Sequence, residues 1–276
     1  MLSVVKSLLF RLKKSKLFWI LLGVCVLLPV LSALLNTVIL EIAEQIAGMP
    51  LGGGLEMLTY MSISELANIS SDVNLMVLLC VSIFLCKEFV DGTIRNTLLS
   101  NKSRSAVYGA YGIVSLIIGG AYLMANFASS LLVLGIPFGF GDVTAAQAIT
   151  SCACSLVLGV CSLLFVVSCV LMFMFATGKQ APSIVLPLLI ALLLPSFISV
   201  AVEIAAYIIS LMQANSDGAV SFTTDFYTWI PFYNALLFDA TKVEGHLVAK
   251  IAGYYTVFSG LFVLVGIRAA NRRDLK

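Results

Sequence analysis

The chain has 276 residues, of which 61% are hydrophobic and only 11% are charged. Soluble domains carry about 25% charged residues, so this composition, with a mean hydropathy of +1.07, excludes a water-soluble globule. The formal net charge of +2 is small, and the placement of the charges is more informative than their sum. We expect an all-α integral membrane protein whose single transmembrane domain covers residues 1–276.

The chain begins with a basic amphipathic segment. Residues 1–16 carry five basic side chains and no acidic one, and their leucines and valines recur at helical spacing. A helix of this kind lies in the plane of the lipid headgroups and faces anionic lipid. We therefore expect an interface helix over residues 1–16, or a simple basic anchor for the span that follows, with membrane lipid as a partner.

Six apolar segments follow this helix. About 20 apolar residues in a helix cross the roughly 30 Å of hydrocarbon in a bilayer. The predicted spans are residues 17–40, 66–87, 106–136, 148–176, 183–211 and 247–268. The outer loop over residues 212–246 holds a cluster of aromatic side chains, which is typical of a membrane interface.

The segment between the second and third spans is polar. Its charged residues are Lys87, Glu88, Asp91, Arg95, Lys102 and Arg104. Placing one such charge at the bilayer centre costs roughly 2.5–3.5 kcal/mol, so six would cost about 15–20 kcal/mol. The segment must therefore lie outside the hydrocarbon.

The same segment has the pattern of a short amphipathic helix between two turns. Asp91-Gly92 is a turn signal, and Thr93 is a candidate helix N-cap. Ile94 and Leu98 then recur at helical spacing. Ser103, near the end of the segment, is a candidate cap for the next helix. We expect a surface helix within residues 88–104.

The basic residues set the orientation in the membrane. Fourteen of the sixteen lie at the N-terminus, between spans 2 and 3, between spans 4 and 5, or at the C-terminus, whereas Lys242 and Lys250 lie on the other side. The positive-inside rule therefore places both termini and residues 88–104 in the cytoplasm. The predicted topology is six spans with the N- and C-termini inside.

The sequence lacks the motifs of an enzyme or an ion pump. It has no phosphate-binding loop: the pair Gly178-Lys179 is followed by Gln, without a glycine at the required offset. We identify no catalytic residues, no metal site and no cofactor held by this chain. Ionisable groups in mid-membrane, which mark ion-coupled transporters, are nearly absent. The chain therefore has no visible energy source of its own: either a partner supplies energy, or the protein is passive.

The polar segment resembles a known signature. The pattern Glu88-x-x-x-Gly92-Thr93-Ile94-x-x-x-Leu98, followed by Ser103-Arg104 and Tyr108, resembles the cytoplasmic signature of permease subunits of ABC-2 type transporters. Residues 92–96 read GTIRN, as in a bacterial subgroup of that family. The surface helix, six spans and long outer loop before the last span also resemble this family across the whole chain.

The resemblance implies an ATP-driven transporter built from two copies of this chain and two copies of a separate ATP-binding cassette ATPase, which would hold ATP and magnesium. Residues 88–104 would form the coupling helix that contacts the ATPase, and the hinge at Lys179 would be a second contact. Short re-entrant helices would form in the outer loop. The implied coupling residues are Glu88, Asp91, Gly92, Thr93, Ile94, Arg95, Leu98, Arg104 and Lys179.

Two polar stripes offer a candidate substrate pathway. Ser196, Ser199 and Glu203 lie on one face of the predicted fifth span, and Asn36 lies on a similar stripe in the first. The alternative is that these side chains form hydrogen bonds between helices. Both interpretations stay open.

The expected function is export of a hydrophobic or amphipathic compound, most simply a toxic or antimicrobial peptide, from a bacterial cell. The resemblance implies a homodimer in the cell membrane and no nucleic-acid partner. Export of a drug, lipid or glycan by the same machinery is one alternative. A membrane-bound sensor or immunity protein without transport is another.

Overall fold

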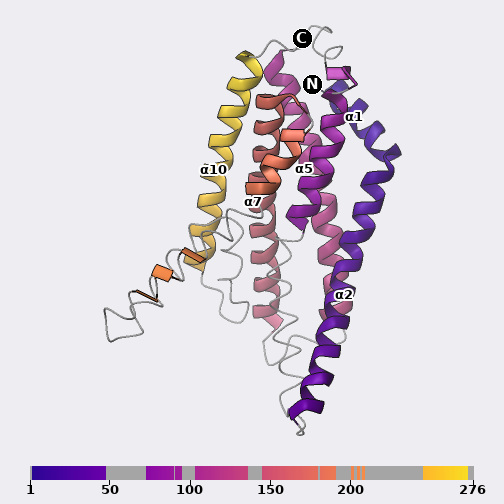
Figure 1. Ribbon diagram of the computed structural model, residues 1–276, viewed down its shortest axis with the longest axis vertical. Helices are drawn as coiled ribbons and strands as arrows, with labels where there is room; N and C mark the ends of the chain where they lie inside the picture. The colour runs from indigo at the N-terminus through magenta and orange to yellow at the C-terminus, as the bar shows by residue number, and fades with distance from the viewer. Residues whose placement is uncertain are drawn as a thin grey trace.

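All regular secondary structure in the described part of the chain is helical (Figure 1). The computed structural model describes residues 2–47, 73–89, 91–94, 103–135, 145–179, 181–190, 200–201, 204–205, 207–208 and 245–272. The labelled helices are α1 (Leu2–Lys14), α2 (Lys16–Ala47), α5 (Arg104–Ser130) with its π-helical continuation η1 (Leu131–Gly135), α7 (Ala145–Thr177) and α10 (Gly245–Arg272). Two further helices cover residues 73–89 and Ala181–Ile190.

Four of the described helices are long and apolar enough to cross a membrane. Their apolar stretches are Lys16–Ile39, Arg104–Val133, Cys152–Thr177 and Val248–Arg272. The predicted all-α membrane character is therefore confirmed. The six-span topology stays a prediction. The helix over 73–89 overlaps the second predicted span and ends two residues beyond it, and Ala181–Ile190 overlaps the start of the fifth. The predicted re-entrant helices fall outside the described residues.

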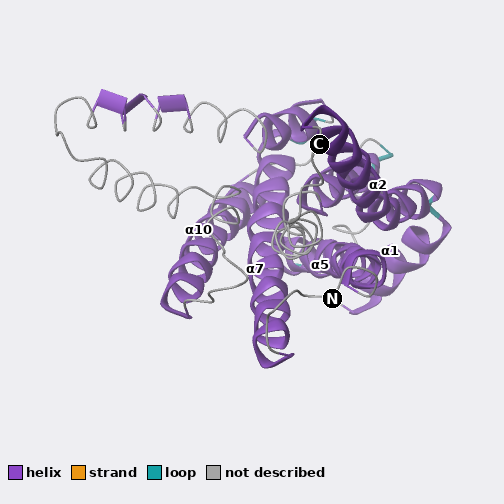
Figure 2. Ribbon diagram, turned by 90° about the horizontal axis from the view of Figure 1, so that it is seen from below, coloured by secondary structure: helices purple, strands orange, loops and turns teal. Residues whose placement is uncertain are grey.

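The helices form an upright bundle in which α7 lies between α10 and α5, and α2 packs on the other side of α5 (Figure 2). The helix over 73–89 and α5 contribute fully buried side chains to one apolar core: Val77, Val81, Val114 and Ile118. These buried valine and isoleucine side chains pack against one another and exclude the surroundings from this part of the core. This contact fixes the end of the helix over 73–89 relative to the start of α5.

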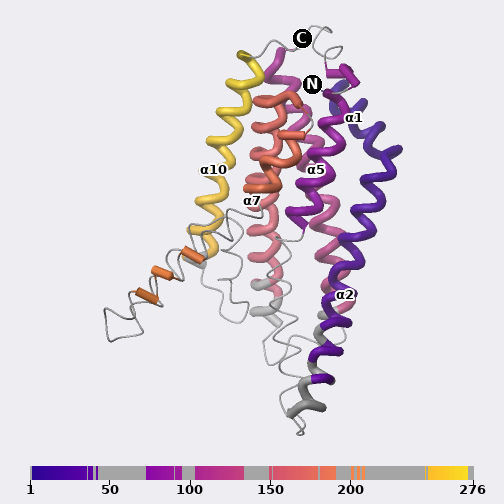
Figure 3. The backbone as a smooth tube through the Cα atoms, viewed as in Figure 1, coloured from indigo at the N-terminus to yellow at the C-terminus, as the bar shows by residue number. Residues whose placement is uncertain are grey.

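Several chain segments end at one end of the bundle. In Figure 3, α1 and the C-terminal end of α10 both lie at the top of the view. Arg104, at the start of α5, donates to the backbone oxygen of Asn271 over 3.1 Å. Arg11 of α1 contacts Glu88 at the end of the helix over 73–89. These contacts define one polar end of an otherwise apolar bundle.

A proline in α2 explains a polar contact deep in the bundle. Pro29 has no N–H, so the carbonyl of Cys25, four residues earlier, lacks the usual helical donor. Nδ2 of the buried Asn126 in α5 donates to that oxygen over 2.9 Å. Oγ of Ser129, one turn further along α5, donates to the carbonyl of Val26 over 2.7 Å. Because hydrocarbon offers no water as a substitute, these bonds fix α2 against α5.

We expect Asn126→Leu to lower the free energy of unfolding by about 1–2 kcal/mol, because the Cys25 carbonyl loses its donor. In a Pro29→Ala background the alanine N–H restores the helical bond to that carbonyl, so the same change should cost less than half as much. Unfolding midpoints of the four purified proteins in detergent micelles measure this. An equal cost in both backgrounds would contradict the role assigned to Asn126.

Candidate functional site

The helix over residues 73–89 ends in a tight turn that begins the predicted coupling segment. The N–H of Asp91 donates to the carbonyl of Lys87 over 2.9 Å, and the N–H of Gly92 donates to that of Phe89 over 3.2 Å. Gly92 has a φ of +66°, in the left-handed region that favours glycine. Helical residues follow at Thr93. The turn predicted from Asp-Gly is present, and Gly92 is what allows the helix to end there.

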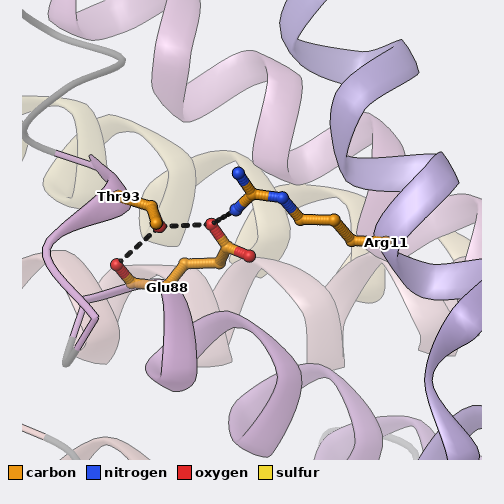
Figure 4. A network of polar contacts seen from close by, with 3 residues as sticks. All are labelled: Arg11, Glu88 and Thr93. Atoms are coloured by element: carbon orange, nitrogen blue, oxygen red, sulfur yellow. Dashed lines mark hydrogen bonds and ion pairs between the residues drawn. The ribbon is translucent and has the colours of Figure 1, made fainter.

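A three-residue polar cluster joins this turn to the N-terminal helix (Figure 4). Nη1 of Arg11 lies 2.6 Å from Oε2 of Glu88. The Thr93 hydroxyl contacts the same carboxylate oxygen and also lies 3.0 Å from the backbone oxygen of Glu88. We call Arg11, Glu88 and Thr93 the clamp. It ties α1, the end of the helix over 73–89 and the residue after the turn to one carboxylate.

The two charged members of the clamp differ in exposure. The side chain of Glu88 is 10% exposed, whereas that of Arg11 is 46% exposed. The hydrogen bond and the negative charge of Glu88 raise the pKa of Arg11 above its usual value, so the guanidinium stays cationic. An enclosed carboxylate depends on its partner more than a solvated guanidinium does. Glu88 is thus the member that needs the contact.

The connection between α7 and the helix Ala181–Ile190 lies against the same region. Oγ1 of Thr177 and Oγ of Ser183 are 2.8 Å apart, and the Ser183 hydroxyl donates to the backbone oxygen of Lys179 over 2.6 Å. The Cys86 thiol, near the end of the helix over 73–89, lies beside Ser183. The Phe89 and Phe175 rings pack edge to face, with centroids 5.4 Å apart. Both predicted contact regions therefore lie at the same end of the bundle.

The start of α5 contacts the end of α10. Nη1 of Arg104 lies 3.5 Å from the backbone oxygen of Ala270 and 3.1 Å from that of Asn271. These are among the last carbonyls of α10, where a cation is favoured. One helical turn away, a Cβ built on Gly266 would lie 2.8 Å from Cζ of Tyr108, so the two helices touch closely here. In this structure Arg104 caps α10.

The structure brings five of the predicted coupling residues together at the turn: Glu88, Asp91, Gly92, Thr93 and Ile94. Ile94 is only 4% exposed and belongs to the core of the bundle, whereas Asp91 is exposed. The Ile94 side chain therefore packs against its own chain.

The remaining predicted coupling and pathway residues do not lie at the turn or fall outside the described residues. Lys179 is exposed on the neighbouring connection, and Arg104 contacts α10. Arg95, Leu98, Ser196, Ser199 and Glu203 lie outside the described residues, and so does the side chain of Asn36. The predicted pathway stays a prediction.

Sequence reasoning missed Arg11. Its only signal was that residues 1–16 are basic, and it lies 77 residues from its partner in the chain. Within the described residues, no three His, Cys, Asp or Glu side chains lie close enough together to hold a metal ion.

Comparison of the chain with models of known protein families, with curated proteins and with solved structures found no match. The chemistry of the polar end therefore has to be judged from its own geometry.

We expect Arg11→Ala to loosen α1 more than Glu88→Gln does. The first change leaves an enclosed carboxylate without its cation, at a cost of about 1–3 kcal/mol. The second leaves a neutral amide beside a half-exposed guanidinium, at a cost below about 1 kcal/mol. Hydrogen exchange of the α1 amides should be about tenfold faster in Arg11→Ala, since 1.4 kcal/mol corresponds to a factor of ten.

Lys13→Ala is the matched control, because Lys13 is an exposed basic residue of the same helix. Exchange in that variant should stay close to that of the unmodified chain. If Lys13→Ala and Arg11→Ala accelerate exchange equally, the clamp does not hold α1.

Proposed function

We propose that this chain is the transmembrane (permease) subunit of an ATP-driven ABC exporter in a bacterial cell membrane. The observation that carries the proposal is the clamp. Glu88 and Thr93, both part of the GTIRN-type signature, are bound together and to Arg11 of the surface helix. A loop that only connects two spans does not require such a joint, whereas a segment that transmits force does.

The contacts at the polar end support a rigid connection between several helices. The turn at residues 91–92 is bonded to the helix over 73–89, the clamp adds α1, and Ser183 with Phe175 adds the connection after α7. Arg104 adds α10. A push on the turn would therefore move several elements as one body, which is how domain rotations are transmitted.

Near the turn, the described part of the chain offers exposed polar side chains to a partner. Asp91, Lys87 and Lys179 are exposed at this end, while Ile94 is buried. We propose that they face the ATP-binding cassette subunit, which supplies ATP and magnesium. Two copies of each subunit would form the complete exporter. The chain itself would carry out no chemistry.

The apolar bundle fits a hydrophobic or amphipathic substrate, with a toxic or antimicrobial peptide as the first candidate and a drug, lipid or glycan as alternatives. The proposed pathway residues are Asn36, Ser196, Ser199 and Glu203. A sensor or immunity protein without transport is the second candidate function, and the well-ordered joint at the polar end argues for force transfer instead.

A photocrosslinking amino acid at position 91 or 179 should capture an ATPase that carries a phosphate-binding loop when the tagged chain is purified from its native membrane. The same probe at position 257 is the matched control, because Val257 is an exposed apolar residue well inside α10. Mass spectrometry of the crosslinked product identifies the partner. Capture of the ATPase from position 257 alone, or from none of the three, would contradict the proposed coupling site.

The conformation of Gly92 offers a second test. Gly92→Pro cannot adopt a φ of +66°, so it should abolish the ATPase activity that this chain stimulates in its partner. Gly92→Asn should reduce that activity far less, because asparagine tolerates the left-handed region and the space around Gly92 is open. Turnover of the reconstituted complex measures this. If both variants keep the ATPase activity of the unmodified complex, the turn does not transmit force.

A further inference from the structure

A cavity of about 730 Å³ opens beside the clamp, at the polar end of the bundle. It lies between α1, the first residues of α2 and the end of the helix over 73–89. Pockets for small molecules have volumes of about 300–1,000 Å³. The cavity is therefore large enough for a ligand. It shares lining residues with the proposed coupling site, but the coupling mechanism assigns no ligand to it.

The walls of this cavity have two kinds of chemistry. One part is apolar and is formed by Phe10, Leu17, Ile83 and Phe84. The rest is formed by charged residues and a few small polar ones. This combination of an apolar wall and a charged wall suits an amphipathic ligand.

The charged wall has an excess of positive charge. Arg11 and Glu88 both line it but form an ion pair with each other. Three basic side chains then face one carboxylate, that of Asp91; these are Lys14, Lys16 and Lys87. Nζ of Lys14 lies 4.5 Å above the centre of the Phe10 ring, at the boundary between the two walls. The cavity therefore favours an anion joined to an apolar group.

Neighbouring residues place the cavity at the depth of the lipid headgroups. Lys16, which lines it, is the first residue of the apolar stretch Lys16–Ile39. The Trp19 side chain is 55% exposed, and its indole N–H donates to the backbone oxygen of Lys13 over 3.0 Å. Tryptophan and basic side chains together mark the boundary between hydrocarbon and water. An anion at this depth is most simply the phosphate of a lipid.

We propose that this cavity binds the headgroup of an anionic phospholipid, with its phosphate facing Lys14, Lys16 and Lys87 and its acyl chains along the apolar wall. A peptide substrate would also have apolar and charged parts, but a phospholipid joins an anion to hydrocarbon at the depth of this cavity. The inference goes beyond the proposed exporter function and holds whether or not an ATPase binds the chain. It requires only that the chain lies in a membrane.

The test uses Trp19 as a reporter in the full-length chain. The chain has two tryptophans, so Trp229→Phe leaves Trp19 as the only one. The protein is reconstituted in vesicles of phosphatidylcholine that contain either brominated phosphatidylglycerol or brominated phosphatidylcholine, since bromine quenches tryptophan on contact. We expect brominated phosphatidylglycerol to quench Trp19 with an apparent affinity about tenfold or more above that of brominated phosphatidylcholine. The reason is that each basic residue near the membrane surface contributes about 1 kcal/mol to the binding of an anionic lipid.

The triple change Lys14→Gln, Lys16→Gln, Lys87→Gln should abolish this preference. The matched control is Lys6→Gln, Lys13→Gln, Arg268→Gln, which removes the same charge from exposed residues that do not line the cavity. The control should keep the preference within about twofold. If the first triple variant does not fold, Lys87→Gln alone should weaken the preference about fivefold, with Lys13→Gln as its control.

Several outcomes would overturn the proposal. Equal quenching by the two brominated lipids would show no preference, and an equal loss in both triple variants would show only general attraction to a charged surface. Reversal of the quenching by millimolar inorganic phosphate or glycerol phosphate would show a site for free anions. Displacement of the brominated lipid by an acidic amphipathic peptide, but not by unlabelled phosphatidylglycerol, would assign the cavity to a peptide.

Discussion

The polar end of this protein depends on one nearly enclosed carboxylate. Glu88 closes the helix over residues 73–89, and its side chain is 10% exposed, so it must have a cation and hydrogen-bond donors close by. Arg11 and Thr93 provide them. Each partner belongs to a different part of the chain, and satisfying this single charge therefore fixes the surface helix and the turn relative to each other. The rest of the polar end is arranged around this contact.

A second constraint of the same kind acts inside the bundle. Pro29 removes the usual helical donor of the Cys25 carbonyl, and Asn126 donates to that carbonyl from α5. In both places an unsatisfied group on one helix is satisfied by a side chain on another. Since apolar packing alone gives little preference between helix pairs in lipid, these polar contacts specify which helices are neighbours. The clamp locates α1, and the Asn126 bond locates α2.

The sequence was sufficient for features that depend on local chemistry. Composition predicted the helical membrane character, Asp91-Gly92 predicted the turn, and Ser103 caps α5 by accepting from the N–H of Ala106. Partners far apart in the chain were not predictable. Arg104 lies 167 residues from Asn271, whose carbonyl it caps, and no local pattern indicates that contact. Asn126 was missed for the same reason, because the open carbonyl belongs to a different helix.

The helical spacing of apolar residues in the coupling segment did not indicate which structure its apolar face contacts. Ile94 recurs with Leu98 at helical spacing, and this spacing identifies an apolar side without saying what covers it. In the structure Ile94 joins the core of its own chain. Among the described residues near the turn, the exposed charged side chains are Lys87 and Asp91. An interface at this position would depend on charge complementarity, which affects association rate and specificity more than affinity.

The clamp and the cavity beside it share residues, and this links the two proposals physically. Arg11, Glu88 and Thr93 line the cavity as well as holding the turn. An anion bound to the neighbouring lysines would lie close to the Arg11–Glu88 pair and would compete with Glu88 for the guanidinium, because both are negative. The lipid around the chain could then alter how firmly α1 is held to the turn. The buried Val5, Leu8 and Leu12 of α1 would keep their apolar contacts, so the bound anion would weaken the ion pair between α1 and the turn and leave the packing of α1 unchanged.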